Sequence, residues 1–436
     1  MNIFGKNKVA ILEDKTQDFV RAFIQLSTKY EIVSFISTQK KEPQYGIPSI
    51  SLDDFFKIPD IDDVLLVVCS KHLDCDLSTL IQRFRNENFK LFRNYIFYEN
   101  ILHDNYFDLM KYTTLYSTKE ITESLIFLKR YKKLYFVNGN CQTDLLFEYL
   151  QRNREFASKY MYLNIPSIHI FDSKIMDIDV YLKYIDLIIT QPIKETNKYE
   201  KKLSTSYLKK NKNENCILIT ISNITSRLYY PQYAKTKNVN SFSLSGKMLF
   251  TYHDANINNF LSQGVVVDEI KRRLNAIDFY DKVFMDAHCQ EQLIDFQQRE
   301  ADCDIKMYDF IKENYSKRRC FHAFNHPCQF VIQELSKRVL TYLNMNHDML
   351  EEDSLDALSK MFYQEQPIYP CVLSYFNFNY YNYKYYPNKF ILDNNFNFND
   401  YIELYSSTYK LSNRLEEALD STATLNTEMH NDGSLN

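Results

Sequence analysis

The sequence predicts an α/β protein with two successive parallel sheets. Its 436 residues are enough for two or three domains with sizeable cores. Short, continuous apolar runs recur as far as residue 222, which is typical of strands buried on both faces of a parallel sheet. Spacers of helical length separate these runs, as expected where helices connect parallel strands.

The first apolar runs predict a Rossmann-like domain over residues 1–130. Strands are expected at residues 8–12, 31–37 and 64–70, with an amphipathic helix over 19–26. The stretch "EDKTQDF" follows the first strand, where a dinucleotide-binding fold would carry G-x-G-x-x-G. Gly5 precedes that strand and cannot serve the turn. The sequence therefore favours a structural or partner-binding role of uncertain nature over dinucleotide binding.

A second set of runs predicts another open parallel sheet in a domain over residues 131–345. It begins after the charged patch "LKRYKK", and its strands are expected at residues 134–138, 159–164, 185–192 and 216–222. Residues 264–307 have apolar positions at helical spacing, and a further helix is expected to begin in "NHPCQFVIQEL".

The last part of the chain differs in composition. Residues 346–420 are expected to form a helical and aromatic extension, rich in Tyr, Phe and Asn, that packs against the body. Residues 421–436 are expected to be disordered.

Bulk composition excludes several classes of function. A net charge of -4 gives no electrostatic footprint for nucleic acid. Nine irregularly spaced cysteines and the lack of an N-terminal apolar segment favour a reducing, cytoplasmic location, and leave open peripheral docking at the inner membrane. No apolar run approaches the roughly 20 residues of a transmembrane helix. The cysteines lack the paired short spacing of a zinc site, so no metal is expected.

The stretch "VNGNCQ" carries the strongest chemical signal. Cys141 follows a predicted strand and opens a predicted helix, at the sheet edge where α/β proteins bind ligands. Helix amides there lower a thiol pKa and can hold an oxyanion. Gly139 allows a tight turn, and Asn140 and Gln142 offer side-chain donors. The alternative is that Cys141 is a small, buried hydrophobic residue with no chemical role.

A thiol nucleophile needs a base, and His326 has the best context of the nine histidines. "FNHP" places it after a β-rich run, with Pro327 at the expected first position of a helix. In a parallel sheet this location is on the same edge as Cys141. The alternative interpretation of His326 is a helix cap or a packed core histidine.

Four elements in order, "VNGNCQ", "DLIITQP", "READCDIKMYDFI" and "FNHPCQFVIQEL", resemble the WcbI family. Members are acyltransferases of capsular-polysaccharide biosynthesis with a sheet similar to that of SGNH-type hydrolases. The resemblance spans residues 134–343 and leaves the N-terminal domain uncovered. It implies an SGNH-like (flavodoxin-like) three-layer domain that takes coenzyme A or acetyl-coenzyme A, a sugar or polysaccharide acceptor, and association with the capsule assembly machinery.

The same resemblance assigns roles by motif position. Cys141 becomes the reactive residue and His326 the base, while Gln142, Gln191 and Asn325 line the pocket. SGNH enzymes carry an acid three residues before the histidine, but this chain has Ala323 there. A carboxylate that orients His326 must therefore come from elsewhere in the chain; the candidates are Asp302, Glu300 and Asp186.

Two questions stay open at the level of sequence. Either Cys141 forms a covalent intermediate, or His326 deprotonates a bound sugar hydroxyl while the turn at 139–142 stabilises the oxyanion. Asn223, which follows a strand, is an oxyanion donor or, more commonly for such a residue, a turn former. The leading function is O-acetylation of a surface-polysaccharide sugar. The alternatives are an esterase or thioesterase, and a non-catalytic sugar- or nucleotide-binding partner of a polysaccharide assembly complex.

Overall fold

The computed structural model divides the chain into two compact units. The first comprises Met1–Ile221 with Ser336–Leu350, and the second Ser222–Leu335 with Glu351–Asn436. The structure describes residues 6–12, 17–28, 30–37, 46–69, 77–97, 106–108, 113–195, 200–234, 243–244, 247–248, 252–347, 366–378 and 397–409. The predicted tail over 421–436 and most of the aromatic stretch before residue 397 lie outside these ranges.

The first sheet has five parallel strands in the order β3-β2-β1-β4-β5. This is the order of the Rossmann type. The strands are β1 (Lys8–Leu12), β2 (Glu31–Ser37), β3 (Ser49–Ser51), β4 (Val64–Val68) and β5 (Tyr95–Phe97), and the helices are α1 (Gln17–Ser27), α2 (Leu52–Phe55) and α3 (Leu77–Asn86). Every residue of β4 is buried, as its unbroken apolar sequence predicts.

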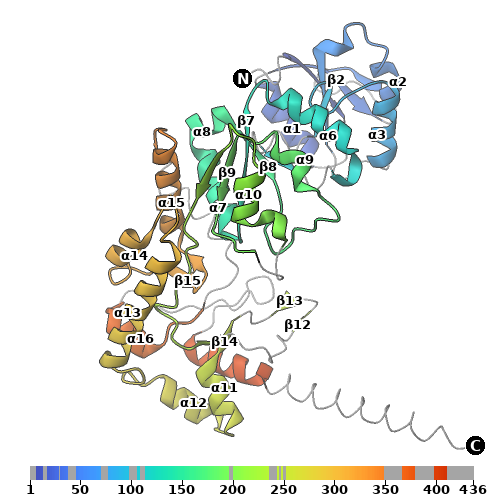
Figure 1. Cartoon of the computed structure of the whole chain (residues 1–436). Coiled ribbons are helices and arrows are strands. Elements are labelled where there is room, and N and C mark those ends of the chain that lie inside the picture. Colours follow the sequence, from blue (N-terminus) through green and yellow to red (C-terminus); the bar gives the residue numbers. More distant parts are fainter. Residues whose placement is uncertain are drawn as a thin grey trace, which may run out of the picture. The chain divides into compact units, whose positions relative to one another are not determined.

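The second sheet also has five parallel strands, in the order β10-β9-β7-β8-β6. The strands are β6 (Tyr106–Asp108), β7 (Lys133–Asn138), β8 (Tyr160–Asn164), β9 (Leu187–Thr190) and β10 (Ile217–Thr220). The helices along this part of the chain are α6 (Thr118–Leu128), α7 (Gln142–Arg152), α8 (Arg154–Lys159), α9 (Ile178–Leu182) and α10 (Thr205–Asn211) (Figure 1). Strand β6 precedes residue 131 yet joins this sheet.

Strand order in the second sheet reverses between β7 and β9. The chain passes from β7 to β8 on one side, then crosses to β9 on the other side of β7. With β7 counted as the first strand, the order is the flavodoxin-like 2-1-3-4, extended at one edge by β6. Open α/β sheets bind ligands at such a switch point, outside the carboxyl ends of the strands. The crevice expected by topology therefore lies after β7 and β9.

The second unit is mainly helical, and its described strands form three two-stranded antiparallel sheets. The strands are β11 (Tyr233–Ala234) with β14 (His253–Asp254), β12 (Ser243–Leu244) with β13 (Lys247–Met248), and β15 (Phe321–Ala323) with β16 (His326–Pro327). The helices are α11 (Ala255–Ser262), α12 (Val267–Leu274), α13 (Lys282–Arg299), α14 (Tyr308–Asn314), α15 (Gln329–Tyr342), which crosses the division between the units, and α16 (Pro370–Phe376). Residues 398–409 are also helical. Helices α12 and α13 confirm the helical periodicity expected over 264–307.

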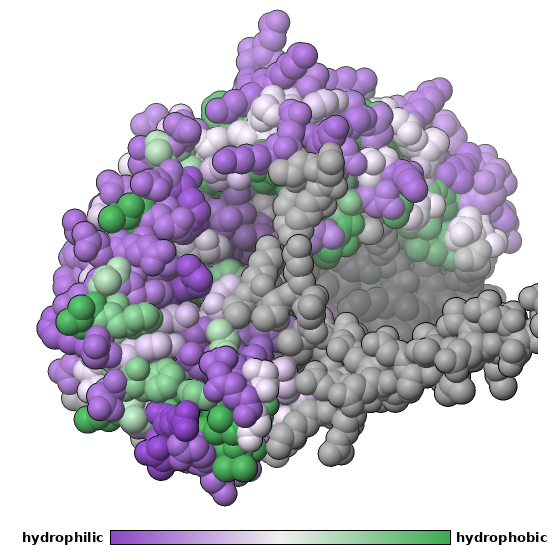
Figure 2. Space-filling view, turned by 60° about the horizontal axis from the view of Figure 1, so that its bottom comes forward, coloured by the Kyte–Doolittle hydropathy of each residue, from purple (hydrophilic) through white to green (hydrophobic). Residues whose placement is uncertain are grey.

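Helices in the described part of the chain are all too short or too polar to cross a bilayer. Figure 2 shows one face of the molecule, on which hydrophilic side chains dominate and hydrophobic ones form small, separate patches.

A buried carboxylate caps helix α11 in the second unit. Asp254 accepts hydrogen bonds from the backbone N–H groups of Asn256 and Ile257, both at 3.0 Å, and from the Tyr369 hydroxyl at 2.7 and 2.8 Å. Burial outweighs these bonds and raises the pKa of Asp254 to about 6. Above that pH, the folded protein must keep a buried carboxylate, which lowers its stability.

We predict that Asp254→Asn removes a specific pH dependence of stability. Because the folded-state pKa is raised, the neutral acid stabilises the fold below pH 3.8, and this contribution is lost as pH rises through about 6. The stability of the native protein relative to Asp254→Asn should fall by roughly 3 kcal/mol over that interval, at about 1.4 kcal/mol per pKa unit. Denaturant unfolding at pH 4.5 and 7.5 should record about 2 kcal/mol of this fall. Parallel profiles for the two proteins would contradict the assignment.

Candidate active site at the ends of strands β7 and β9

The turn Gly139–Asn140–Cys141 follows β7, on the switch-point side of the sheet. Strand β7 is buried from Leu134 to Asn138, and helix α7 begins at Gln142. The register aligns Asn138 with Thr190, so the residues after these two strand ends meet. The N–H of Gln191 donates to the carbonyl of Asn138 at 2.9 Å. The sequence-predicted strand, turn and helix are therefore confirmed.

Gly139 is required by a close approach. A Cβ at this position would lie 2.5 Å from Oε1 of Gln191 and 2.7 Å from Cγ2 of Thr143. Real Cβ atoms do not approach neighbours this closely, so any larger residue would displace the Gln191 amide. This explains why one of only six glycines in the chain stands here.

The side-chain amide of Gln191 is hydrogen-bonded to those of Asn140 and Gln142. Its Oε1 accepts from the N–H of Asn140 at 3.0 Å. Its Nε2 donates to Oδ1 of Asn140 at 3.3 Å and to Oε1 of Gln142 at 3.2 Å. Gln142 and Gln191 are almost fully buried. The structure thus brings together Gly139, Asn140, Gln142 and Gln191, four of the residues that the sequence and the resemblance indicate.

Cys141 lies at the N-cap of α7 and is exposed, whereas the other cysteines that the structure describes are buried. The interpretation of Cys141 as a packed hydrophobe is therefore wrong. The expected lowering of its thiol pKa is also wrong. Desolvation by the surrounding atoms raises the pKa, and the carboxylate of Asp144 adds to the rise. The N–H groups of Cys141 and Gln142 act in the expected direction but are outweighed.

Asp144 is a candidate functional residue that sequence reasoning missed. It lies in the first turn of α7, three residues after Cys141, so the two side chains share a helix face. The residue is exposed, yet partial desolvation by nearby atoms raises the pKa of its carboxyl group. A carboxylate with a raised pKa beside a thiol has the properties of a proton acceptor. The Cys-x-x-Asp spacing at a helix start was the available signal.

The loop after β8 also contacts the turn. The N–H of Ile168 donates to the carbonyl of Gly139 at 3.1 Å. The next residue, His169, is exposed. This loop, the turn after β7 and the end of β9 together form the described surroundings of Cys141 within the first unit.

His326 occupies a different setting from the one expected. It lies in β16, paired with β15 in a hairpin outside the two parallel sheets, and α15 begins only at Gln329. The placement of Pro327 at a helix's first position, and of His326 on a parallel-strand edge, is therefore wrong. The run "RCFHAF" forms a strand, but one that pairs locally.

Burial, and to a lesser extent the neighbouring His322, lowers the pKa of His326 to about 4, so its imidazole is neutral at pH 7. The Tyr252 hydroxyl donates to Oδ1 of Asn325 at 2.7 Å and lies 3.5 Å from Nε2 of His326. His326 and Asn325 belong to the second unit and Cys141 to the first. A Cys141–His326 pair stays a prediction.

Two of the acids considered as partners of His326 have structural roles. Asp186 accepts from Lys129 and from the N–H of Leu134, each at 2.8 Å, at the start of β7 and thus at the opposite edge from Cys141. Buried Glu300 accepts from the N–H groups of Met307 and Tyr308 at the start of α14.

Asp302, the third acid considered, is exposed. Asn223, after β10, accepts through its backbone carbonyl from the N–H of Thr225 and from Arg299, which fits a turn former. Within the described residues, the side chains form no cluster suited to a metal ion.

We predict that Gly139→Ala destabilises the protein by about 1–3 kcal/mol, the usual cost of overpacking. The cause would be displacement of the Gln191 side chain. The substitution should therefore cost less in a Gln191→Ala background, which removes two of the three close contacts. Denaturant unfolding of the four proteins measures the coupling, and strictly additive effects would contradict this explanation.

The raised thiol pKa predicts the reactivity of Cys141. Alkylation by iodoacetamide should be slow at pH 7 and still rising above pH 9, because the thiolate is the reactive form. Asp144→Asn removes a nearby negative charge and should speed alkylation at pH 8 roughly two- to fivefold. Peptide mass spectrometry identifies the modified cysteine. Asp268→Asn, in the first turn of α12, is the matched control, and an equal effect of both substitutions would contradict the role of Asp144.

One protein-family model matches the segment of the chain that contains this turn. The family described as "Polysaccharide biosynthesis enzyme WcbI" matches residues 134–348, which include the turn at 139–142, Gln191 and the 321–327 hairpin. No curated protein matches the chain significantly. A dipicolinate synthase from Bacillus halodurans is 12% identical over 51% of this chain and 83% of its own, with a TM-score of 0.16 that supports no inference.

A solved structure of WcbI, a polysaccharide biosynthesis enzyme, has a TM-score of 0.56 and 20% identity, over 64% of this chain and 90% of that one. It is described as the native protein without a disulfide bond between coenzyme A and one of its cysteines. At this identity the likeness shows a shared fold. Residues 134–348 of this chain therefore form a domain of the WcbI family of polysaccharide biosynthesis enzymes.

Proposed function

We propose that this protein is an O-acetyltransferase that transfers an acetyl group from acetyl-coenzyme A to a sugar hydroxyl of a capsular or other surface polysaccharide. The observation that carries the proposal is the exposed Cys141 at the β7–β9 switch point, in a turn whose neighbouring residues Asn140 and Gln142 are bound by the buried amide of Gln191. The relative whose structure relates coenzyme A to a cysteine supports coenzyme A as the donor's carrier. The sheet order supports an SGNH-like assignment of the domain.

The proposed chemistry uses the turn as an oxyanion site. When a sugar hydroxyl attacks the thioester carbonyl, negative charge develops on the carbonyl oxygen, and the N–H groups at the start of α7 can donate to it. Collapse of the tetrahedral species breaks the carbon–sulfur bond and releases the coenzyme A thiolate, which takes up a proton. The proton of the sugar hydroxyl needs an acceptor.

The acceptor differs between two routes. In direct transfer, neutral His326 takes the sugar proton; its pKa of about 4 makes it a weak base that gains strength only beside a developing charge. In covalent transfer, Cys141 first attacks acetyl-coenzyme A, releases coenzyme A and becomes an acetyl-thioester. The sugar hydroxyl then attacks this thioester and takes the acetyl group. Because its pKa is raised, Cys141 is a thiol at neutral pH and must lose a proton to Asp144 or to His326.

Location and partners follow from the donor. Acetyl-coenzyme A is a cytoplasmic metabolite, so we propose that the reaction takes place in the cytoplasm on a sugar or polysaccharide precursor. Association with the capsule assembly machinery is part of the same proposal.

We predict acetyl transfer to a sugar acceptor that depends on His326, and also on Cys141 if the route is covalent. The full chain, incubated with acetyl-coenzyme A and candidate capsule sugars, should give acetylated sugar and free coenzyme A in equal amounts. His326→Ala should lower the rate by about 10²-fold or more, the usual loss of an acid–base contribution. Cys141→Ala should lower it at least as much on the covalent route, and much less on the direct route, in which only the backbone N–H groups of the turn act. His347→Ala is the control, because His347 is exposed and adjoins Asn346, whose carbonyl binds Asn153 at the far end of α7.

Mass spectrometry of the products and of the Cys141 peptide separates the outcomes. If acetate and coenzyme A are released without a sugar acceptor as fast as coenzyme A is released with one, the protein is a thioesterase instead. Full activity in both variants would contradict a catalytic role for these residues. An acetylated Cys141 peptide would favour the covalent route over direct transfer.

A further inference from the structure

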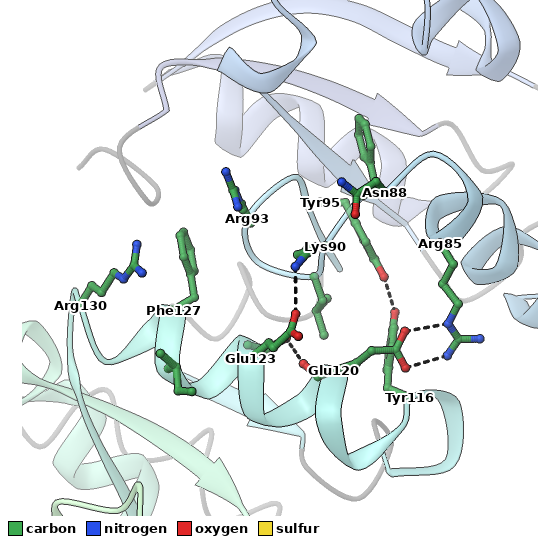
Figure 3. A pocket seen from close by; sticks show the side chains of 14 residues that line it. Arg85, Asn88, Lys90, Arg93, Tyr95, Tyr116, Glu120, Glu123, Phe127 and Arg130 are labelled. Atoms are coloured by element: carbon green, nitrogen blue, oxygen red, sulfur yellow. Dashed lines mark hydrogen bonds and ion pairs between the residues drawn. The ribbon is translucent and has the colours of Figure 1, made fainter.

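A pocket lies in the first unit, outside the segment that the family matches. It has a volume of about 530 Å³ and is lined only by residues between Arg85 and Arg130 (Figure 3). Its walls are the α3–β5 connection and helix α6 with the chain on either side of it. Tyr95 begins β5, so the pocket is at the amino-terminal edge of the first sheet. Its size is that of a small-molecule site.

Both acids that line the pocket are already paired with cations. Glu120 accepts from Nε of Arg85 at 2.7 Å and from its second guanidinium nitrogen at 3.1 Å. Although burial opposes it, these bonds and those from Ser117 lower the pKa of Glu120 to about 2. Glu123 accepts from Nζ of Lys90 at 3.0 Å. These two pairs fix the wall formed by α6.

Two arginines of the lining remain without a carboxylate partner among the described residues. The pocket carries four cationic side chains (Arg85, Lys90, Arg93 and Arg130) and two acidic ones, which leaves two positive charges uncompensated. Arg93 and Arg130 supply them, on the side of the pocket away from Arg85 (Figure 3). The guanidinium carbon of Arg130 lies 5.9 Å from the ring centre of Phe127.

The rest of the lining is aromatic and apolar. The hydroxyl groups of Tyr95 and Tyr116 are hydrogen-bonded to each other at 2.9 Å, and both residues are buried, so they close the pocket without offering a free ring face. Phe127 lies between Arg93 and Arg130 in Figure 3. A planar ring could stack on such a surface while an anion meets the two guanidinium groups.

We propose that this pocket binds a nucleoside phosphate, with the phosphates on Arg93 and Arg130 and the base against the ring of Phe127. Arginine is suited to this role because its planar fork donates two parallel hydrogen bonds to a phosphate. The mode differs from that of dinucleotide-binding Rossmann folds, which hold phosphate on helix amides after a glycine-rich turn at the opposite edge. It therefore explains how a sheet of Rossmann order could bind a nucleotide without that glycine motif.

Calorimetric titration of the full chain with UDP and GDP tests the proposal, because neither nucleotide is a fragment of coenzyme A. Both should bind the native protein. Arg93→Ala and Arg130→Ala should each weaken binding roughly tenfold, the usual loss of a hydrogen bond between charged groups. Phe127→Leu should weaken binding of UDP and GDP but leave that of inorganic pyrophosphate unchanged.

Arg83→Ala is the matched control, since Arg83 is on the same helix as Arg85 but pairs with Asp53 outside the pocket. Circular dichroism confirms that each variant is folded. Absence of binding by the native protein, or equal affinity of the native protein and the Arg93→Ala/Arg130→Ala double variant, would overturn the proposal. Nucleotide binding is measured separately from acetyl transfer at Cys141. A failure to detect acetyl transfer would therefore leave the binding result unaffected.

Discussion

The site depends on the close approach of the Gln191 side chain to Gly139, which is possible only because glycine has no side chain. The Gln191 amide fills the space that a Cβ would occupy, and from there it binds the backbone of Asn140 and the side chain of Gln142. Through this contact the ends of β7 and β9 and the start of α7 become one rigid element at the switch point. Cys141 is placed by that element, with no side-chain cap bond of its own.

At Cys141, two physical effects on the thiol pKa oppose one another, and desolvation by neighbouring atoms is the stronger. Helix-terminal amides favour the thiolate, as the position predicts, but desolvation and the charge of Asp144 favour the neutral thiol more strongly. Cys141 is thus an exposed residue whose thiol is largely protonated at neutral pH. A protein that uses it as a nucleophile must supply a base, and the desolvated carboxylate of Asp144 lies on the same helix face.

Much of the first unit could be predicted from local sequence. Runs such as "LYFVN" and "DLIIT" are too apolar for a half-exposed strand, and their order along the chain indicates parallel sheets. Gly139 and Gln191 could each be singled out by motif. Their contact could not be predicted, because 52 positions separate them and only the β7–β9 register brings them together.

Other features gave ambiguous local signals. The run "RCFHAF" fits a hairpin as well as a parallel strand, and a proline near a helix start fits the strand before it as well as the first turn. Asp144 was missed because an acid in the first turn of a helix is usually explained by the helix dipole. Strand β6 has only three residues, too few for a periodic pattern.

A crystal structure of the full chain with coenzyme A tests the central claim most directly. The account predicts that the pantetheine thiol reaches Cys141 in the crevice after β7 and β9, with the amide network of Gln191 intact. Coenzyme A bound at another place, with that crevice empty, would contradict it.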